Sequence, residues 1–183
     1  NVIKLANRRQ RDSQRLTVVE GAREVERALR SGIVPSEAFI CEELVDASTS
    51  SATAESEKAV ALLREIETVD LMNVSHAVYE KMAYRGNSGG VLMTVPYWGK
   101  SLDELGDASF VVVVEGGEKP GNLGAILRTA DAAGVDALIL CGAGTDMYNP
   151  NAIRASLGAI FAVDVVQAEK TAVIDWLQQN KFK

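Results

Sequence analysis

The residues best suited to chemistry lie in the stretch 115–135, EGGEKPGNLGAILRTADAAGV. Its glycines and Pro120 predict a tight loop after a buried strand, and Asn122 is expected to cap the helix that follows. A helix N-terminus at the carboxyl end of a parallel strand is a common place for an anion to bind. Arg128 does not fit the buried face of this helix, and its long side chain can reach back toward Asn122. We therefore expect an amide and a guanidinium to converge on one phosphate or ribose.

A simpler interpretation of Arg128 is that it pairs with Asp131 or Glu118 on a solvated helix face, and both interpretations are open from the sequence. The loop contains neither G-x-x-x-x-G-K-[ST] nor G-x-G-x-x-G, the glycine patterns of phosphate-binding loops and dinucleotide-binding folds. The sequence therefore disfavours a P-loop enzyme and a standard dinucleotide-dependent dehydrogenase. A nucleotide-binding α/β enzyme of another kind is a weaker alternative.

The second informative stretch is DMYNPNAIRASLGAIFAVDVV, near the C-terminal end of the chain. Asn149 followed by Pro150 predicts a helix N-cap and a first helical residue, and Gly158 is expected to end the helix after two turns. Arg154 and Ser156 flank the apolar residues of this short helix. Taken alone, Ser156 is more typical of a hydroxyl at a helix end than of a functional group.

Residues that bind metals or form disulfides are scarce. Cys41 and Cys141 each lie in or at the end of a short apolar run, which predicts buried, reduced thiols. His76 is the single histidine, so a zinc site of the usual four-ligand kind would need carboxylates. It follows Ser75, an expected N-cap, and is interpreted as a surface or capping residue. We therefore expect no metal site.

The elements that must position these residues alternate between helices and strands. An arginine-rich helix or extended arm is expected at 2–14. The elements that follow are a strand at 16–19, a helix at 22–31, a strand at 38–41, a helix at 58–66, a strand at 69–74, a helix opened by Ser75 and a strand at 91–95. Residues 46–57, DASTSSATAESE, contain no large apolar residue and are expected to form a polar loop.

A second alternation follows a connection that contains Pro and Gly. Its first strand, FVVVV at 110–114, is a run of five apolar residues that suits a parallel strand buried on both faces. The later elements are a helix at about 123–133, a strand at 137–141, a helix at 150–157, a strand around 160–166 and a helix near 170–179. The chain is therefore expected to be an α/β protein in two parts.

The charge of the chain is uneven. The 183 residues carry a net charge of -6, but the first 15 hold five basic side chains against one acidic one, which is +4 and leaves -10 for the remainder. The arginines of this basic arm are Arg8, Arg9, Arg11 and Arg15. They suit contacts with the phosphates of a nucleic acid, and the alternative is a solvated, partly disordered terminus.

The ends of the chain carry their own expectations. No run approaches 18 consecutive apolar residues, and the N-terminus lacks the apolar core of a signal peptide, so we expect a cytoplasmic protein without membrane contact. The sequence begins at Asn1 without a methionine and stops at Lys183 after an amphipathic helix, so either end could be a cut.

Together, the two informative stretches resemble the first and second motifs of the SpoU or TrmH family of RNA ribose 2'-O-methyltransferases. The matching residues are E-x-x-x-x-P-G-N-x-G-A-I-x-R-T-A-D-A-x-G and, after a strand, Y-N-P-N-A-I-R-A-S-x-G-A-x-F. That family belongs to the SPOUT superfamily, which binds S-adenosylmethionine in a knotted α/β domain. Residues 16–95 are similar to its small L30e-like N-terminal α/β domain, through VVEGAREVERALRSG and the glycine-rich turn before VLMTVP.

The resemblance implies methyl transfer from S-adenosyl-L-methionine to a ribose 2'-hydroxyl of ribosomal or transfer RNA, with ribosomal RNA favoured, by a homodimer formed through the catalytic domain. It implies catalytic roles for Asn122 and Arg128. Arg128 would act either as the base toward the 2'-hydroxyl or by holding a phosphate and stabilising the developing alkoxide. Arg154 and Ser156 would lie near the phosphate of the target nucleotide.

The resemblance also implies a division of the chain. Residues 1–97 would form an RNA substrate-binding domain with the basic arm, 98–109 a linker, and 110–183 the N-terminal portion of the methyltransferase domain. The family's third motif, a Gly-[SN]-Glu-x-x-Gly loop followed by Ser-Leu-Asn, has no match in residues 159–183. Cofactor-binding residues are therefore expected C-terminal to Lys183. The alternative is a non-catalytic RNA-binding protein, or a truncated fragment, on the same scaffold.

Overall fold

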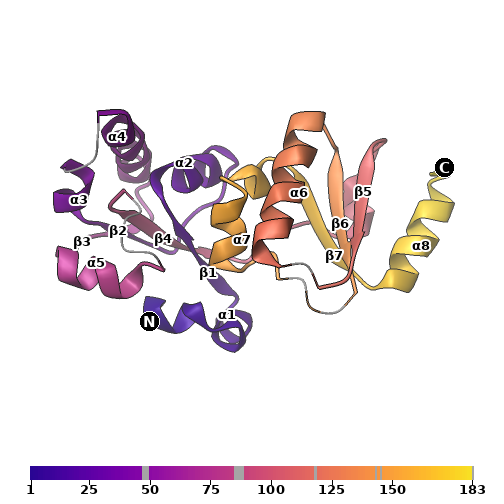
Figure 1. The fold of residues 1–183 in the computed structure, drawn as a ribbon, viewed down its shortest axis with the longest axis horizontal. Coiled ribbons are helices and arrows are strands. Elements are labelled where there is room, and N and C mark those ends of the chain that lie inside the picture. The colour runs from indigo at the N-terminus through magenta and orange to yellow at the C-terminus, as the bar shows by residue number, and fades with distance from the viewer. Residues whose placement is uncertain (47–49, 85–88, 118, 143, 145, 183) are drawn as a thin grey trace.

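The computed structural model is an elongated molecule in which two β-sheets follow one another along the long axis (Figure 1). It describes residues 1–46, 50–84, 89–117, 119–142, 144 and 146–182, with the backbone alone for 50–53. Each sheet carries helices, which confirms the expected α/β class.

The first sheet has four strands in the order β1-β4-β2-β3. They are β1 (Leu16–Glu20), β2 (Glu37–Ile40), β3 (Asp70–Asn73) and β4 (Val91–Pro96). Strand β4 runs antiparallel to both β1 and β2, whereas β2 and β3 are parallel. The helices of this part are η1 (Val2–Ala6), α1 (Arg8–Gln14), α2 (Ala22–Arg30), α3 (Glu42–Asp46), α4 (Ser50–Arg64) and α5 (His76–Met82). The basic arm is thus helical, in two short pieces.

The second sheet has three parallel strands in the order β5-β6-β7. They are β5 (Val111–Glu115), β6 (Ala137–Cys141) and β7 (Asp164–Ala168). The helices of this part are η2 (Leu102–Leu105), α6 (Pro120–Ala133), α7 (Pro150–Ala155), η3 (Ala159–Phe161) and α8 (Lys170–Gln179). Every residue of the central strand β6 is buried, as its uninterrupted apolar sequence suggests.

One hydrophobic core joins the two parts. Its buried residues include Val25 of α2, Leu123 and Leu127 of α6, and Ile153 of α7. Helix α7 packs against α6 on one side and against β1 on the other, so it lies between the two sheets (Figure 1). Apolar area removed from water at this junction stabilises one arrangement of the two parts.

Residues 46–57 are not the polar loop that the sequence suggests. Helix α4 begins at Ser50 and runs through most of this stretch, while 47–49 lie outside the described residues. The helix packs closely against α2, and small side chains permit this: Ser56 and Ala59 are both fully buried. The Ser56 hydroxyl donates a hydrogen bond to the carbonyl oxygen of Gly89 at 2.9 Å. Small residues therefore serve as a packing surface here, although none is strongly hydrophobic.

Strand β5 is also different from expectation, because it is not buried on both faces. It is an outer strand of its sheet, and Val113 is 40% exposed. Val112 and Val114 pack against the core on the other face. An apolar run of this kind fits the central and the outer strand of a parallel sheet equally well, and only the strand order decides which it is.

The expectations for the last helix and for the two cysteines are confirmed. The last helix spans Lys170–Gln179, and Cys41 and Cys141 are buried free thiols. The final strand, β7, begins later than expected because η3 precedes it.

In the described part of the chain, no group of three or more potential ligands among His, Cys, Asp and Glu is arranged to hold a metal ion. No helix within the same residues is long and apolar enough to cross a membrane.

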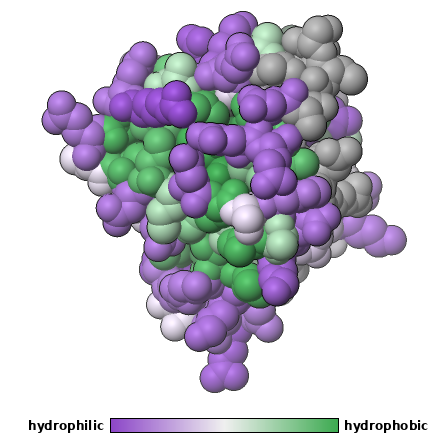
Figure 2. Space-filling view, turned by 90° about the vertical axis from the view of Figure 1, so that its left-hand side faces the viewer, coloured by the Kyte–Doolittle hydropathy of each residue, from purple (hydrophilic) through white to green (hydrophobic). Residues whose placement is uncertain are grey.

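Strand β3 is one of the two outer strands of the first sheet and is only partly buried. Figure 2 views the molecule from this end and shows hydrophobic residues gathered within a hydrophilic surround. Met72 and Val74 lie here, half-buried against the cluster of Phe39 and Tyr79. This end faces away from the junction between the two sheets (Figure 1).

Candidate functional site

Helix α6 begins where the loop after β5 ends. Its N-cap is Lys119 and its first residue is Pro120, so the expectation that Asn122 is the N-cap is wrong. Proline suits the first helical position because its φ is already helical and the missing N–H has no partner there, and the helix therefore starts earlier. Asn122 is the third helical residue and is exposed. The helix N-terminus still lies at the carboxyl end of a parallel strand, as predicted.

Helices α6 and α7 touch at Gly124. A Cβ atom at this position would come within 2.5 Å of the Ala155 carbonyl carbon and Cβ, so only glycine allows the two backbones to lie this close. Arg128, one turn further along α6, donates from Nη1 to the carbonyl oxygen of Ala155. The guanidinium is therefore held at the C-terminal end of α7.

This contact of Arg128 involves a backbone carbonyl and neither of the two carboxylates suggested as its partners. Asp131 instead pairs with Arg27 on helix α2, where its Oδ2 lies 3.3 Å from Nη1 of that arginine. The other suggested partner, Glu118, lies outside the described residues. Arg128 thus points toward the second informative stretch, and Asp131 forms a contact with the first half of the chain.

Helix α7 is capped as the sequence predicts. Asn149 is the N-cap, its Oδ1 accepts from the backbone N–H of Asn151 at 2.9 Å, and Pro150 is the first helical residue. Ser156 ends the helix and is completely buried. Its hydroxyl donates to the carbonyl oxygen of Ile153 at 2.6 Å. The hydroxyl therefore serves the end of the helix, which favours the structural interpretation of this serine.

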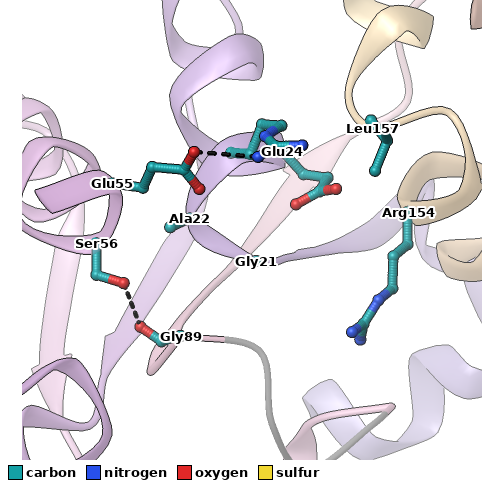
Figure 3. Close-up of a pocket in the computed structure, with 9 residues that line it drawn as sticks. Gly21, Ala22, Glu24, Glu55, Ser56, Gly89, Arg154 and Leu157 are labelled. Carbon is teal, nitrogen blue, oxygen red and sulfur yellow. Dashed lines mark hydrogen bonds and ion pairs between the residues drawn. The ribbon is translucent and has the colours of Figure 1, made fainter. Parts of the chain in front are cut away.

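Arg154 projects from α7 into a hollow of about 240 Å³ between the two parts of the chain (Figure 3). Its Nη1 lies 3.0 Å from Oε1 of Glu20, at the end of β1. Glu20 is 4% exposed, and its Oε2 accepts from the backbone N–H of Tyr84 at 2.5 Å. The described lining residues are Gly21, Ala22, Arg23, Glu24, Glu55, Ser56, Gly89, Arg154 and Leu157.

The hollow brings both signs of charge together. Arg23 pairs with Glu55 at 3.1 Å, and both side chains are about half exposed. Glu24 is almost completely buried, and this burial raises the pKa of its carboxyl group above the ordinary value, although its own backbone N–H and the charge of Arg154 oppose the rise. Neither Glu20 nor Glu24 can be recognised as a site residue from the sequence, because glutamates beside or within the first turn of a helix are usually solvated.

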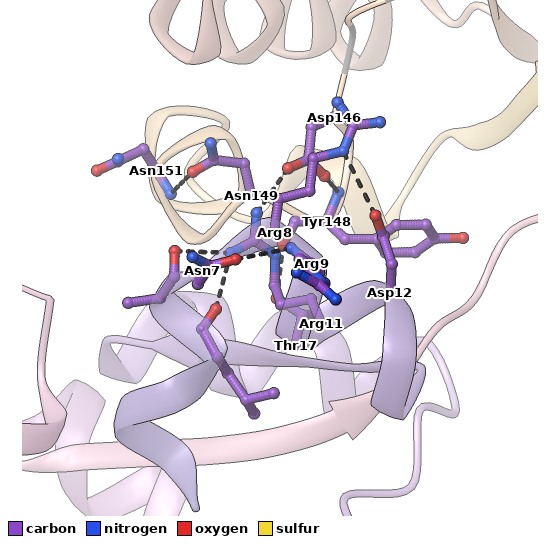
Figure 4. Close-up of polar contacts among 12 residues, drawn as sticks. Asn7, Arg8, Arg9, Arg11, Asp12, Thr17, Asp146, Tyr148, Asn149 and Asn151 are labelled. Atoms are coloured by element: carbon purple, nitrogen blue, oxygen red, sulfur yellow. Dashed lines mark hydrogen bonds and ion pairs between the residues drawn. The ribbon is translucent and has the colours of Figure 1, made fainter.

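The basic arm contributes fewer accessible arginines than the sequence suggests. Arg8, Arg9 and Arg15 are exposed, and the Arg15 guanidinium carbon lies 4.7 Å from the centre of the Tyr97 ring. Arg11 is 2% exposed and hydrogen-bonded inside the protein, so the expectation that it contacts RNA does not fit its position (Figure 4). The lone histidine, His76, is a surface residue near Glu80, which agrees with its interpretation.

The structure thus gathers part of the predicted site. Both Arg128 and Arg154 are linked to α7, Arg128 by its hydrogen bond to the carbonyl of Ala155 and Arg154 as a residue of the helix. Asn122 lies six residues before Arg128 on α6. Guanidinium groups near an open hollow suit a ligand that carries several negative charges, such as a phosphodiester chain.

Comparisons with known proteins give a consistent result. The model of the SpoU rRNA Methylase family matches residues 109–183, and the model of an MRM3-like substrate binding domain matches residues 1–93. The 23S rRNA (guanosine(2553)-2'-O)-methyltransferase RlmP of Bacillus subtilis (strain 168) is 28% identical over 185 residues, which cover 98% of this chain and 65% of the relative.

Two solved structures are similar over nearly the whole chain. An RNA 2'-O ribose methyltransferase is 36% identical with a TM-score of 0.72, over 98% of this chain and 66% of the other. The AdoMet-bound rRNA methyltransferase from Sinorhizobium meliloti is 26% identical with a TM-score of 0.79, over 97% of this chain and 63% of the other. The chain therefore spans about two thirds of the length of the relatives it matches.

Proposed function

This chain belongs to the SpoU/TrmH family of RNA methyltransferases, and from that premise we propose that it transfers a methyl group from S-adenosyl-L-methionine to a ribose 2'-hydroxyl of RNA. The observation that carries the proposal is the contact of Arg128 with Ala155, which joins α6 to α7 beside the hollow that receives Arg154. The named substrate of the Bacillus relative supports ribosomal rather than transfer RNA.

Arg128 and Asn122 are proposed as the catalytic residues. A guanidinium remains protonated in water and acts as a base only when it is strongly desolvated. Arg128 is exposed, which favours the other role: it holds a phosphate of the target and stabilises the negative charge that develops on the 2'-oxygen. The proton then passes to another group or to water, while Asn122 helps to orient the ribose.

RNA is proposed to lie across the junction between the two parts of the chain. Arg154 of α7 and Arg23 of α2 both line the hollow, and Arg8, Arg9 and Arg15 provide exposed cations on the arm. Local patches of this kind attract phosphates even though the chain as a whole is acidic. Ser156 is left out of this proposal because its hydroxyl is buried and bonded within α7.

The proposed cofactor fits the described residues in part. At the carboxyl ends of β5 and β6, the Gly116 N–H donates to the Cys141 carbonyl at 3.0 Å, and a Cβ on Gly144 would lie 3.1 Å from the Gly117 Cα. Gly117 and Gly144 are exposed at this edge, which is where α/β sheets bind ligands. S-adenosylmethionine supplies the electrophilic methyl group when bound, and the residues that enclose it are expected after Lys183.

The remaining assignments are also proposals. We divide the chain into an RNA-binding domain at 1–97, a linker at 98–109 and the first portion of the methyltransferase domain at 110–183. The linker segment contains η2 and forms a bridge from Lys100 to Val166 of β7, so it packs on the second part. A homodimer formed through the catalytic domain and a cytoplasmic location complete the proposal.

The direct test is methyl transfer by the full-length protein. Labelled S-adenosylmethionine and unmodified ribosomal RNA are incubated with the wild type, with Arg128→Ala and with Arg64→Ala, an exposed arginine at the end of α4. We expect Arg128→Ala to lose activity by about a hundredfold and Arg64→Ala to keep it. Label that reaches a base rather than a ribose 2'-oxygen would contradict the proposed reaction. Tight RNA binding without any methyl transfer would instead support the non-catalytic alternative.

A further inference from the structure

Arg11 is among the largest fully buried side chains in the described part of the chain, although it comes from the basic arm. Its neighbours on α1, Arg8 and Arg9, are exposed. The short helix therefore directs one arginine inward and two outward. A buried arginine requires a reason, because removing a guanidinium from water is costly unless its donors are satisfied.

Two sets of acceptors receive the Arg11 guanidinium (Figure 4). Its Nη1 donates to the carbonyl oxygens of Leu5 at 2.7 Å and Ala6 at 3.0 Å, at the end of η1. Its Nη2 donates to Oδ2 of Asp146 at 2.6 Å, in an ion pair whose two side chains are 2% and 12% exposed. The guanidinium thus connects the N-terminal arm to a residue of the second half of the chain.

Asp146 organises the turn that leads into α7. Its Oδ1 accepts from the backbone N–H of Tyr148 at 3.1 Å, and its carbonyl oxygen accepts from the N–H of Asn149 at 3.2 Å. Asn149 is the N-cap of the helix. A second link comes from β1, where the Thr17 hydroxyl donates to the carbonyl oxygen of Tyr148 at 2.6 Å. The start of α7 is therefore held by hydrogen bonds from the N-terminal half.

The energetics favour a positioning role over simple stabilisation. A buried ion pair often stabilises a protein no more than well-packed apolar residues would, because both charges lose their hydration. The Nε atom of Arg11 is buried and has no hydrogen-bond partner among the described residues, which adds to that cost. What the guanidinium does provide is direction, since its rigid planar donors can reach Asp146 and the carbonyl oxygens of Leu5 and Ala6 together in few geometries.

We propose that Arg11 is a positioning residue that places α7, and through the Ala155 carbonyl the guanidinium of Arg128, for the reaction. The pathway runs from Arg11 to Asp146, along the capped helix, to the carbonyl that Arg128 binds. The effect on catalysis rests on the proposed function. The effect on the position of α7 does not, and the two are tested separately.

The first test concerns α7 alone. Amide hydrogen exchange is measured on the full-length protein for the wild type, Arg11→Met, Arg11→Lys and Gln10→Ala, the last changing an exposed residue of the same helix. For the backbone amides of 148, 149, 151 and 152 we expect exchange about tenfold faster in both Arg11 variants and unchanged in Gln10→Ala. Arg11→Lys keeps the charge and serves if Arg11→Met does not fold. Unchanged exchange at 148–152 in a folded Arg11 variant would overturn the proposal.

The second test separates positioning from RNA binding. For methyl transfer we expect Arg11→Lys to lower kcat about tenfold while KM for RNA stays within about twofold of the wild type. Arg9→Gln, which changes an outward arginine, should raise KM and leave kcat nearly unchanged. A rise in KM alone for Arg11→Lys would assign Arg11 to RNA binding and overturn its positioning role.

The role of Asp146 provides a further check. Asp146→Asn keeps an acceptor for the Tyr148 N–H but weakens the pair with Arg11. The double variant with Arg11→Lys should have a kcat no lower than the worse single variant, because both changes break one link. If the fold-loss of kcat in the double variant equals the product of the two single losses, Arg11 and Asp146 act independently and Arg11 acts by another route. If the wild type methylates no RNA, the proposed function fails, and the exchange experiment still decides the placement of α7.

Discussion

Arg128 donates a hydrogen bond to the carbonyl oxygen of Ala155, a residue 27 positions later in the chain. The bond joins the two stretches in which the sequence concentrates its candidate chemistry. The bond also requires glycine at position 124, where α6 and α7 cross. A side chain there would push the Ala155 carbonyl away from the Arg128 guanidinium. The position of Arg128 is thus a property of two helices together, and the following predictions concern the contacts that maintain it.

The first prediction concerns the crossing of the helices. Gly124→Ala places a methyl group within 2.5 Å of Ala155, so α7 must move or the helices must separate. We expect a loss of about 1–3 kcal/mol in the free energy of unfolding and a fall in methyl transfer, because the Ala155 carbonyl is displaced. Thermal and urea unfolding measure the first effect.

Gly121→Ala is the matched control, since it changes a glycine of the same helix that has open space around its Cβ direction. It should be neutral or stabilising by up to about 1 kcal/mol, because alanine has the higher helix propensity. Equal stabilities for the two variants would show that the crossing at Gly124 is looser than the structure indicates.

The second prediction distinguishes Arg128 from its neighbour Asp131. Asp131→Asn breaks only the ion pair with Arg27, whose partners are 35% and 43% exposed. Pairs this exposed contribute little, so we expect a loss of at most about 1 kcal/mol in stability. Methyl transfer should remain close to that of the wild type. A loss as large as that of Arg128→Ala would indicate that Asp131 does orient Arg128.

The third prediction concerns pH and Glu24. Burial raises the pKa of this carboxyl group in the folded protein above its ordinary value of 4.5, so its favourable contribution is complete below 4.5 and is lost as the pH rises through the folded pKa. Glu24→Gln cannot lose a proton. The variant should therefore gain stability relative to the wild type as the pH increases above 4.5.

Urea unfolding at a series of pH values measures this difference. Below pH 4.5 the two proteins should differ by a constant amount, because the wild-type carboxyl group is protonated in both states there. A difference that stays constant up to pH 8, or that shrinks as the pH rises, would show that the carboxylate of Glu24 is well stabilised in the hollow.

The fourth prediction concerns the outward arginines of the arm. Replacing Arg8, Arg9 and Arg15 with glutamine should weaken RNA binding and make its dependence on salt shallower by about 2 in the slope of log K against log salt concentration. Arg30→Gln is the control, because Arg30 is exposed on α2 and pairs with Glu26. Binding isotherms at several salt concentrations give the slopes. An unchanged slope in the triple variant would place the RNA elsewhere on the surface.

Several features of the site could be predicted from the sequence because they depend on neighbours along the chain. The pair Asn149 and Pro150 starts α7 as expected, since a capping amide and a fixed φ act within one turn. The same local reasoning predicted the start of α6 wrongly, because the helix begins at Pro120 and Asn122 is already its third residue. It also missed the first half of α4, in which buried small residues such as Ser56 take the place of large apolar ones.

The sequence by itself determined the order of the elements, the family motifs and the presence of arginines near them, because periodicity, caps and turns act over a few residues. The tertiary structure alone decided what each arginine does. Arg11 is buried and forms an ion pair with Asp146. Arg27 pairs with Asp131, which the sequence offers as a partner of Arg128, and Arg128 binds the carbonyl oxygen of Ala155 in α7. These partners lie from 27 to 135 positions apart, and only packing of the two sheets around one core brings them within hydrogen-bonding distance.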